Sequence, residues 1–236
     1  MFVLVVDTAT PAVTAAVARV AADGAVTLLA ERVTVNARAH GELLAPAVSA
    51  VLAEAGIEPA ELTAVVAGVG PGPFTGLRVG LVTAAALGHA LGIPTYGVCS
   101  LDALGLDAAG SGLGPGAGGG GSGTVLVATD ARRREVYWAV YSGRTRLSPA
   151  SVDRPDEVAR RAVELGAGFA VGDGALLYAG VLGLPVSDEP RYPSAAALAA
   201  LAGERVRTGA PSEPLTPLYL RRPDAVAPGE RKPVLR

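Results

Sequence analysis

The sequence GPGPFTGLRVG occupies residues 70–80 and separates an apolar run, residues 64–69, from a long stretch rich in small residues. This order predicts a strand, a tight turn and then a helix over about residues 75–91. Thr75 is the expected N-cap of that helix. A turn of this kind directs backbone N–H groups at an anion, packs against a partner, or simply connects the two elements.

The 70–80 segment resembles GPGSFTGLRIG, the signature of the TsaB family, also called YeaZ, with Pro73 in place of the usual Ser. Residues 38–42 (Arg-x-His-x-Glu), 130–137 (Asp-Ala-Arg-x-x-Glu-Val-Tyr) and 217–221 (Pro-x-Tyr-Leu-Arg) resemble the same family. The resemblance extends from Asp7 to Arg221. It implies a non-catalytic subunit of the bacterial machinery that forms threonylcarbamoyladenosine (t6A) at position 37 of tRNAs reading codons that begin with adenine.

The order of predicted elements indicates the fold class. Apolar runs at residues 2–6, 12–19 and 26–33 predict three antiparallel strands, followed by helix, strand, helix and strand. This order resembles the ribonuclease-H-like half of the actin-like ATPase fold. We therefore expect an α/β protein of two subdomains, residues 1–101 and 102–210, followed by a C-terminal segment and disordered tail, residues 211–236. A Gly-rich stretch, residues 110–123, is expected to be a flexible loop in the second subdomain.

Composition excludes several functional classes. A formal charge of −2 argues against a free-standing nucleic-acid-binding protein, although arginines cluster at residues 132–134 and 221–222, where solvated charge is the simpler reading. The single cysteine, Cys99, excludes an internal disulfide and a multi-cysteine zinc site. Residues 79–101 carry no charge, but Gly92 and Pro94 predict the end of a helix rather than a membrane span. We expect a cytoplasmic protein without a secretory signal.

The phosphate-binding turns of actin-like ATPases are altered in this chain. In the first turn Ala9 replaces the usual glycine, and Pro11 removes a further N–H donor. Ala131 replaces the glycine of the second turn. The resemblance to actin-like folds therefore implies a vestigial nucleotide site with weak residual binding of ATP or ADP and no required cofactor. Its expected residues are Asp7, Thr8, Thr10, Asp130, Gly172 and Gly174. Asp7 also fits the simpler role of ending a strand.

Neither a metal site nor a catalytic residue is expected. His40 and Glu42 are two positions apart on a predicted helix and so do not face each other. The only other histidine, His89, lies on a different helix. The catalytic paralogue of the family, TsaD, carries a His-x-x-x-His metal motif, which this chain cannot form.

The two predicted helices, residues 40–56 and 75–91, each have a wide apolar face and an opposite face that is also poor in charge. A single sheet covers only one face of each helix, so a second protein surface is the natural cover for the other. We expect a partner interface at Arg38, His40, Glu42, Ala45, Ser49, Ala53, Phe74, Thr75, Arg78, Val82, Ala85 and His89.

The resemblance also implies the partners. They are a TsaD-like catalytic subunit and a TsaE-like ATPase. The sequence leaves open whether two copies of this chain pair when the partner is absent. Contact with tRNA is expected only within the complex, and no membrane contact is expected.

Two other functions are consistent with parts of the pattern. An actin-like ATPase or small-molecule kinase needs a working phosphate-binding turn. A peptidase needs a nucleophile and base, and two histidines on apolar helices do not support one.

Overall fold

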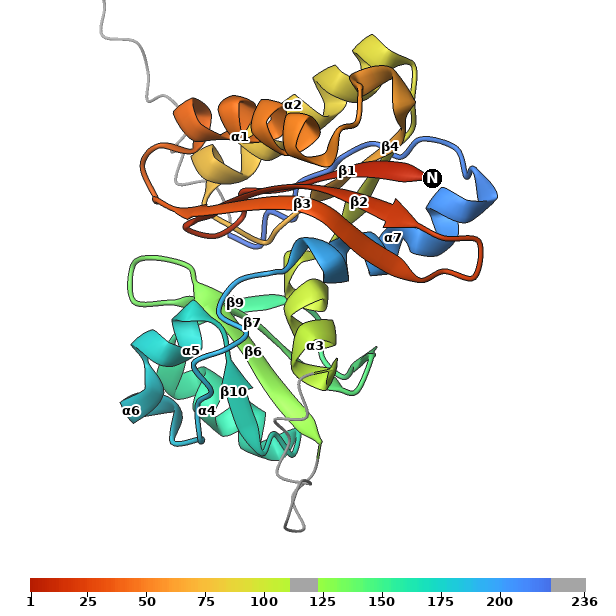
Figure 1. Cartoon of the computed structure of the whole chain (residues 1–236). Helices are drawn as coiled ribbons and strands as arrows, with labels where there is room; N and C mark the ends of the chain where they lie inside the picture. The colour runs from red at the N-terminus through yellow and green to blue at the C-terminus, as the bar shows by residue number, and fades with distance from the viewer. Residues whose placement is uncertain (111–122, 222–236) are drawn as a thin grey trace, which may run out of the picture.

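Two α/β lobes make up the structure, a computed structural model that describes residues 1–110 and 123–221 (Figure 1). The first lobe has a five-stranded sheet in the order β3-β2-β1-β4-β5. β1 pairs antiparallel with β2, which pairs antiparallel with β3, while β4 runs parallel to β1 and to β5. The strands are β1 (Phe2–Asp7), β2 (Ala12–Val20), β3 (Val26–Val35), β4 (Leu62–Gly68) and β5 (Thr95–Val98). The three expected antiparallel strands and the expected α/β class with two subdomains are confirmed.

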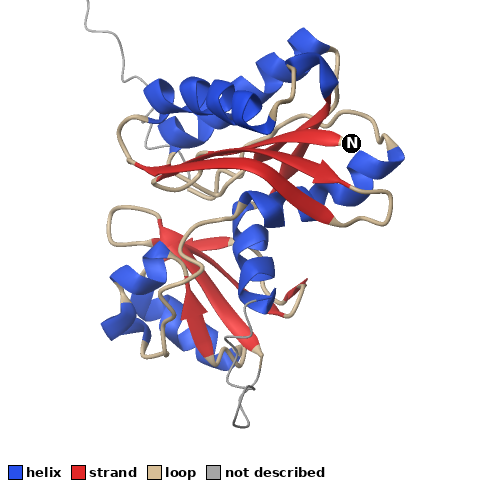
Figure 2. Cartoon of the chain, in the orientation of Figure 1, coloured by secondary structure: helices blue, strands red, loops and turns tan. Residues whose placement is uncertain are grey.

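Helices cover both faces of this sheet, which explains why β1 and β4 are continuous apolar runs rather than alternating ones (Figure 2). α1 (His40–Ala55) and α2 (Phe74–Leu91) pack on one face, and a 3-10 turn, η1 (Pro59–Glu61), leads from α1 into β4. α2 is long and apolar enough to cross a membrane by length and composition alone, but in the fold one side of it packs on the sheet.

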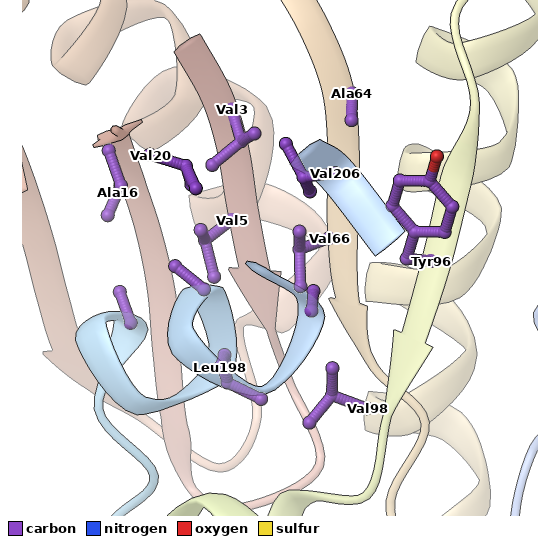
Figure 3. Packing of buried hydrophobic residues seen from close by; sticks show 14 of the residues in the cluster. Val3, Val5, Ala16, Val20, Ala64, Val66, Tyr96, Val98, Leu198 and Val206 are labelled. Atoms are coloured by element: carbon purple, nitrogen blue, oxygen red, sulfur yellow. The ribbon is translucent and has the colours of Figure 1, made fainter. Parts of the chain in front are cut away.

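α7 (Ala195–Thr208) covers the other face of the same sheet, which corrects the expected division of the chain. Residues 102–210 were expected to form the second subdomain. Instead Leu198 and Val206 of α7 pack among Val3, Val5 and Val66 of the central strands (Figure 3). The physical reason is that α1 and α2 leave this apolar face uncovered, and the alanine-rich side of α7 fits closely on it. Ser194 caps α7 by accepting a hydrogen bond from the N–H of Ala197, as its position before the apolar run indicates.

The second lobe has a smaller sheet in the order β10-β6-β7-β8, and β9 pairs with β7. α3 packs on one face of this sheet, and α4, α5 and α6 pack on the other. The elements are α3 (Ser100–Gly110), β6 (Thr124–Asp130), β7 (Val136–Ser142), β8 (Thr145–Arg146), β9 (Ser151–Asp153), α4 (Pro155–Glu164), β10 (Phe169–Val171), α5 (Asp173–Leu177) and α6 (Ala179–Leu182). The expected flexible loop at residues 110–123 lies outside the described residues, apart from its two ends.

Residues 211–221 follow α7 and run along the edge of the first lobe without forming a helix or strand. The N–H of Glu213 donates to the carbonyl of Thr95 in β5 at 2.9 Å, and the N–H of Leu218 donates to the carbonyl of Val69 at 2.9 Å. Arg221 then pairs with Glu135 in the second lobe. This segment therefore adds a further connection to the two chain crossings, from β5 to α3 and from α6 to α7, that already join the lobes. The tail expected to be disordered, residues 222–236, lies outside the described residues.

The start of α2 differs from the expectation. Thr75 is not the N-cap of α2, because the helix begins one residue earlier and Pro73 occupies the cap position without a side-chain hydrogen bond. The φ of Pro73, −59°, is one that proline adopts without strain, so the departure from the family serine removes a hydroxyl but fits the backbone. In α1, Pro46 lies inside the helix.

Candidate functional site

The first turn, which binds phosphate in actin-like ATPases, has its acidic side chain fully engaged. Asp7 is buried, and its Oδ1 accepts the N–H of Ala9 at 2.8 Å. Its Oδ2 accepts the hydroxyl of Ser100 at 2.6 Å, from the start of α3. Burial raises the pKa of Asp7 from its ordinary value, against the opposing effect of these hydrogen bonds. Both carboxylate oxygens therefore hold the connection between β1, its turn and α3 in place.

The GPGP loop packs directly on this turn. A Cβ atom on Gly72 would lie 2.2 Å from the carbonyl oxygen of Ala9, so only glycine allows this approach. From the second lobe, the hydroxyl of Tyr137 donates to the carbonyl of Gly72 at 3.4 Å. The loop thus fills the space beside Ala9 and links the two lobes at this point.

Thr8 and Thr10 tie the same turn to the two helices. The Thr8 hydroxyl donates to the carbonyl of Gly76 at 2.7 Å and accepts the N–H of Gly80 at 2.9 Å. The Nε2 of His40 donates to the carbonyl of Thr10 at 2.9 Å. His40 is only 8% exposed, so its expected place in a partner interface is wrong: it faces the turn, not the outside. It orients the start of α1 against the turn.

The glycines of the expected adenosine-binding turn are explained by packing on β6. Gly172 has φ of +103°, and a Cβ atom there would lie 2.2 Å from the carbonyl oxygen of Ala128. A Cβ atom on Gly174 would lie 2.6 Å from the carbonyl carbon of Thr129. Asp130, at the end of β6, accepts the N–H of Arg132 at 2.8 Å and pairs with its guanidinium at 3.1 Å.

A cavity of about 190 Å³ lies between the first turn, the start of α2 and the second lobe. Its wall is made of Thr8, Thr10, Pro11, Ala37, His40, Pro73, Phe74, Thr75, Gly76 and Arg132. The structure therefore brings Thr8 and Thr10 together with Arg132, whereas Asp7, Asp130, Gly172 and Gly174 are not part of this wall. Small-molecule sites measure roughly 300–1,000 Å³, so the cavity fits a group smaller than a whole nucleotide.

One side of α1 and α2 is exposed over its whole length, and we call it the outer helical face. It comprises Glu42, Ala45, Ser49 and Ala53 on α1 and Phe74, Thr75, Arg78, Val82, Ala85 and His89 on α2, with Arg38 just before α1. Val82 is 65% exposed and Phe74 is 56% exposed. The centre of the face is made of small and apolar side chains, with charged residues near its ends.

An aromatic cluster at one end of the outer helical face was not foreseen. The rings of Phe74 and Tyr219 stack with centroids 5.4 Å apart, and the guanidinium carbon of Arg78 lies 3.9 Å from the Phe74 centroid. The Nε of Arg78 donates to the hydroxyl of Tyr219 at 2.6 Å. The closing motif around Tyr219 was recognised in the sequence, but its position beside residue 74 follows only from the fold.

Asp173, which begins α5, gives a pH prediction. Burial raises its pKa to about 6, against the hydrogen bond from the N–H of Asp130. The folded protein thus holds this proton more tightly than the unfolded chain, whose pKa is near 3.8, and the free energy of unfolding falls as pH rises through this range. We expect Asp173→Asn, which keeps the acceptor oxygen, to be more stable than wild type by about 1–3 kcal/mol at pH 7.5. Thermal unfolding should show no difference at pH 3.5. An equal difference at both pH values would contradict the prediction.

Within residues 1–110 and 123–221, no group of three His, Cys, Asp or Glu side chains lies close enough together to hold a metal ion.

Comparisons with known proteins identify relatives over nearly the whole chain. The family model described as TsaD, tRNA N6-adenosine threonylcarbamoyltransferase, matches residues 27–172. An uncharacterized protein of Mycobacterium tuberculosis is 50% identical over 94% of this chain and 93% of its own length. The tRNA threonylcarbamoyladenosine biosynthesis protein TsaB of Escherichia coli is 33% identical over 60% of this chain and 55% of its own length.

Solved structures show the same similarity. A crystal structure from Pseudomonas aeruginosa, described as similar to the peptidase YEAZ, is 30% identical with a TM-score of 0.74, covering 93% of this chain and 99% of that one. A structure described as YeaZ from the same organism is 28% identical with a TM-score of 0.72, covering 93% and 100%.

Proposed function

Since this chain belongs to the TsaB/YeaZ family and acts in t6A biosynthesis on tRNA, we propose that it is the non-catalytic subunit of that machinery. In this proposal it pairs with a TsaD-like transferase through the outer helical face and helps to recruit a TsaE-like ATPase in the cytoplasm. Without the transferase, the same face pairs two copies of this chain.

The observation that carries the proposal is the composition of the outer helical face. Ala45, Ser49, Ala53 and Ala85 are small and exposed, so the helices of a partner can approach closely. Protein–protein interfaces commonly have an apolar centre and a polar rim. Glu42 and His89 lie toward the ends of the outer helical face, where such a polar rim is expected. The TsaD family model spans both α1 and α2, so a transferase of that family is expected to present a comparable helix pair.

The first turn supports a non-catalytic role. An actin-like ATPase or kinase needs hydrogen-bond donors in this turn that are free to bind phosphate. Here the N–H of Ala9 and the hydroxyl of Ser100 both donate to Asp7, and Gly72 packs against the carbonyl of Ala9. The cavity beside the turn is small for a nucleotide. We therefore propose that the protein requires no cofactor and that any residual binding of ATP or ADP is weak.

Reconstitution of t6A formation tests this function. We expect the purified chain, given tRNA and the threonylcarbamoyl-adenylate precursor, to form no t6A. Adding the TsaD-like transferase and the TsaE-like ATPase should give sustained formation, and omitting the chain should lower the rate at least about tenfold. Nucleoside analysis of the tRNA by mass spectrometry measures the product. Formation of t6A by the chain and precursor alone would contradict the proposal, as would full activity without the chain.

Two competing activities are measured on the same sample. Hydrolysis of ATP by the pure chain would favour an actin-like ATPase or kinase, and cleavage of peptides would favour a peptidase. We expect neither, because the His40 imidazole is bonded to the carbonyl of Thr10 and His89 lies on the outer helical face.

A further inference from the structure

One end of the outer helical face carries an arginine that two aromatic rings hold in place. Arg78 is exposed on α2, and its guanidinium carbon lies 3.9 Å from the ring centroid of Phe74 and 5.7 Å from that of Tyr219. Its Nε donates to the hydroxyl of Tyr219 at 2.6 Å. A side chain that is already ordered loses less conformational entropy when it binds a ligand. The aromatic cluster, formed by Phe74, Arg78 and Tyr219, therefore presents a preorganised guanidinium.

Tyr219 is itself held by the segment that follows α7. The N–H of Leu218 donates to the carbonyl of Val69 in the first lobe at 2.9 Å. Arg221 pairs with Glu135 in the second lobe. The chain is thus anchored on both sides of Tyr219, once to each lobe, and the phenol ring is a fixed support for the Arg78 side chain.

The terminal nitrogens of Arg78 are free to bind a ligand. Arginine has five N–H donors in a planar fork, and Tyr219 accepts the one on Nε. Among the ion pairs within residues 1–110 and 123–221, none includes Arg78. The fork formed by its two Nη atoms matches a carboxylate, which accepts two parallel N–H bonds.

The charges of the outer helical face do not balance one another. Among its described residues the arginines are Arg38 and Arg78, and the one acid is Glu42. The other acid of α1, Glu54, is paired with Arg32 of β3. A second copy of this chain brings the same two arginines and one acid, so a pair of copies leaves two arginines without a carboxylate. A different protein that contributes an acidic side chain at this end removes that deficit.

We propose that the aromatic cluster binds an Asp or Glu side chain of the TsaD-like transferase, and that this contact makes the chain prefer the transferase to a second copy of itself. The inference rests on the proposed function, which supplies the partner. Val82, one turn further along α2, is apolar and 65% exposed, which suits a protein surface rather than a nucleic acid.

The two rings give the contact its strength. Phe74 is 56% exposed and Tyr219 is 44% exposed, so a partner can cover both rings and exclude water from the ion pair. Tyrosine and arginine are enriched among the residues that dominate binding at protein interfaces. Tyr219 acts through Arg78: its hydroxyl accepts from Nε and leaves both Nη atoms pointing their donors elsewhere. It is therefore a positioning residue for the carboxylate contact.

Arg78→Gln tests the contact. The residue is exposed, so the variant should fold as wild type does, which circular dichroism checks. We expect its affinity for the purified transferase to fall at least about 30-fold, because the carboxylate of the partner is left buried and unpaired. Self-association of the pure chain should stay the same or strengthen, because a like charge has been removed from each copy. Calorimetric titration measures the first affinity and analytical ultracentrifugation the second.

Three further variants separate charge, geometry and position. Arg78→Lys keeps the charge without the fork, so its loss of affinity should be smaller than that of Arg78→Gln. Tyr219→Phe keeps the ring but removes the acceptor, and should weaken binding about 3–10-fold. In the Arg78→Gln background the same change should cost nothing further, which a merely structural role of the hydroxyl would not produce. Arg144→Gln removes an exposed arginine between β7 and β8 and should bind as wild type.

The outcomes distinguish this inference from the proposed function. If Arg78→Gln bound the transferase as tightly as wild type, the inference would be overturned and the proposed pairing would stand. Equal weakening of transferase binding and self-association would also overturn it, since Arg78 would then serve both pairings alike. Loss of tRNA binding by the pure variant, with unchanged transferase affinity, would assign the cluster to RNA instead. Failure of wild type to bind the transferase would refute the proposed function and this inference together.

Discussion

The variant Ser49→Arg/Val82→Asp should fold as wild type does but bind the TsaD-like partner at least about 100-fold more weakly. Both side chains are exposed on the outer helical face. A charged substitution at an exposed position usually changes the free energy of unfolding by no more than about 0.5 kcal/mol. In an interface between helices the same charges would be buried without partners, at a cost of several kcal/mol. Each 1.4 kcal/mol corresponds to a tenfold loss of affinity.

A matched control lies on the second lobe. Val163 of α4 is 66% exposed, close to the 65% of Val82, so Val163→Asp makes the same chemical change at the same exposure. Circular dichroism of each variant and size-exclusion chromatography with the partner measure folding and binding. The control should bind as wild type. A double variant that folds and still binds would place the interface elsewhere.

Gly172→Ala should lower the free energy of unfolding by about 3 kcal/mol in the absence of any nucleotide. The backbone there, φ +103° and ψ 161°, is a conformation that only glycine adopts readily. The new Cβ would also lie 2.2 Å from the carbonyl oxygen of Ala128, which cannot move without disturbing β6. The backbone strain and the steric contact each cost about 1–3 kcal/mol, and neither depends on a nucleotide. The melting temperature should fall by roughly 6–12 °C.

Gly180→Ala provides the comparison, because Gly180 lies in α6 and a Cβ there would meet no atom within 4 Å. This variant should be neutral or more stable by up to about 1 kcal/mol. If Gly172→Ala left stability unchanged and abolished binding of ATP, the glycine would serve a nucleotide rather than the fold.

The elements of the first lobe could be predicted because each depends on residues close in sequence. The apolar runs at β1, β2 and β3 and the helical spacing in α1 and α2 predicted both the order of elements and the exposed sides of the two helices. Both α1 and α2 were placed within a few residues of their actual ends. Periodicity records which side of an element is buried, but not what buries it.

The parts that were missed depend on contacts between distant residues. α7 was assigned to the wrong lobe because its sequence shows an apolar side but not which sheet it covers. The pairing of Arg78 with Tyr219 joins positions 141 residues apart. Burial of His40 arises from the first turn, 30 residues earlier, whose carbonyl it bonds. In the candidate site, the arginines at residues 132–134 were noticed as a charge cluster, but their left-handed backbone and the cavity beside them appear only in three dimensions.

The return of α7 to the first sheet has a consequence for synthesis on the ribosome. The last strand of that sheet, β5, ends at Val98, but the helix that covers its second face ends at Thr208. At roughly 5–20 residues per second, the intervening chain takes on the order of 5–20 s to translate. During that interval the nascent first lobe exposes an apolar surface that includes Val3, Val5 and Val66. The second lobe, whose strands are contiguous in the chain, can finish folding first. A chaperone that binds nascent chains should therefore contact the amino-terminal sheet and release it only after α7 has emerged.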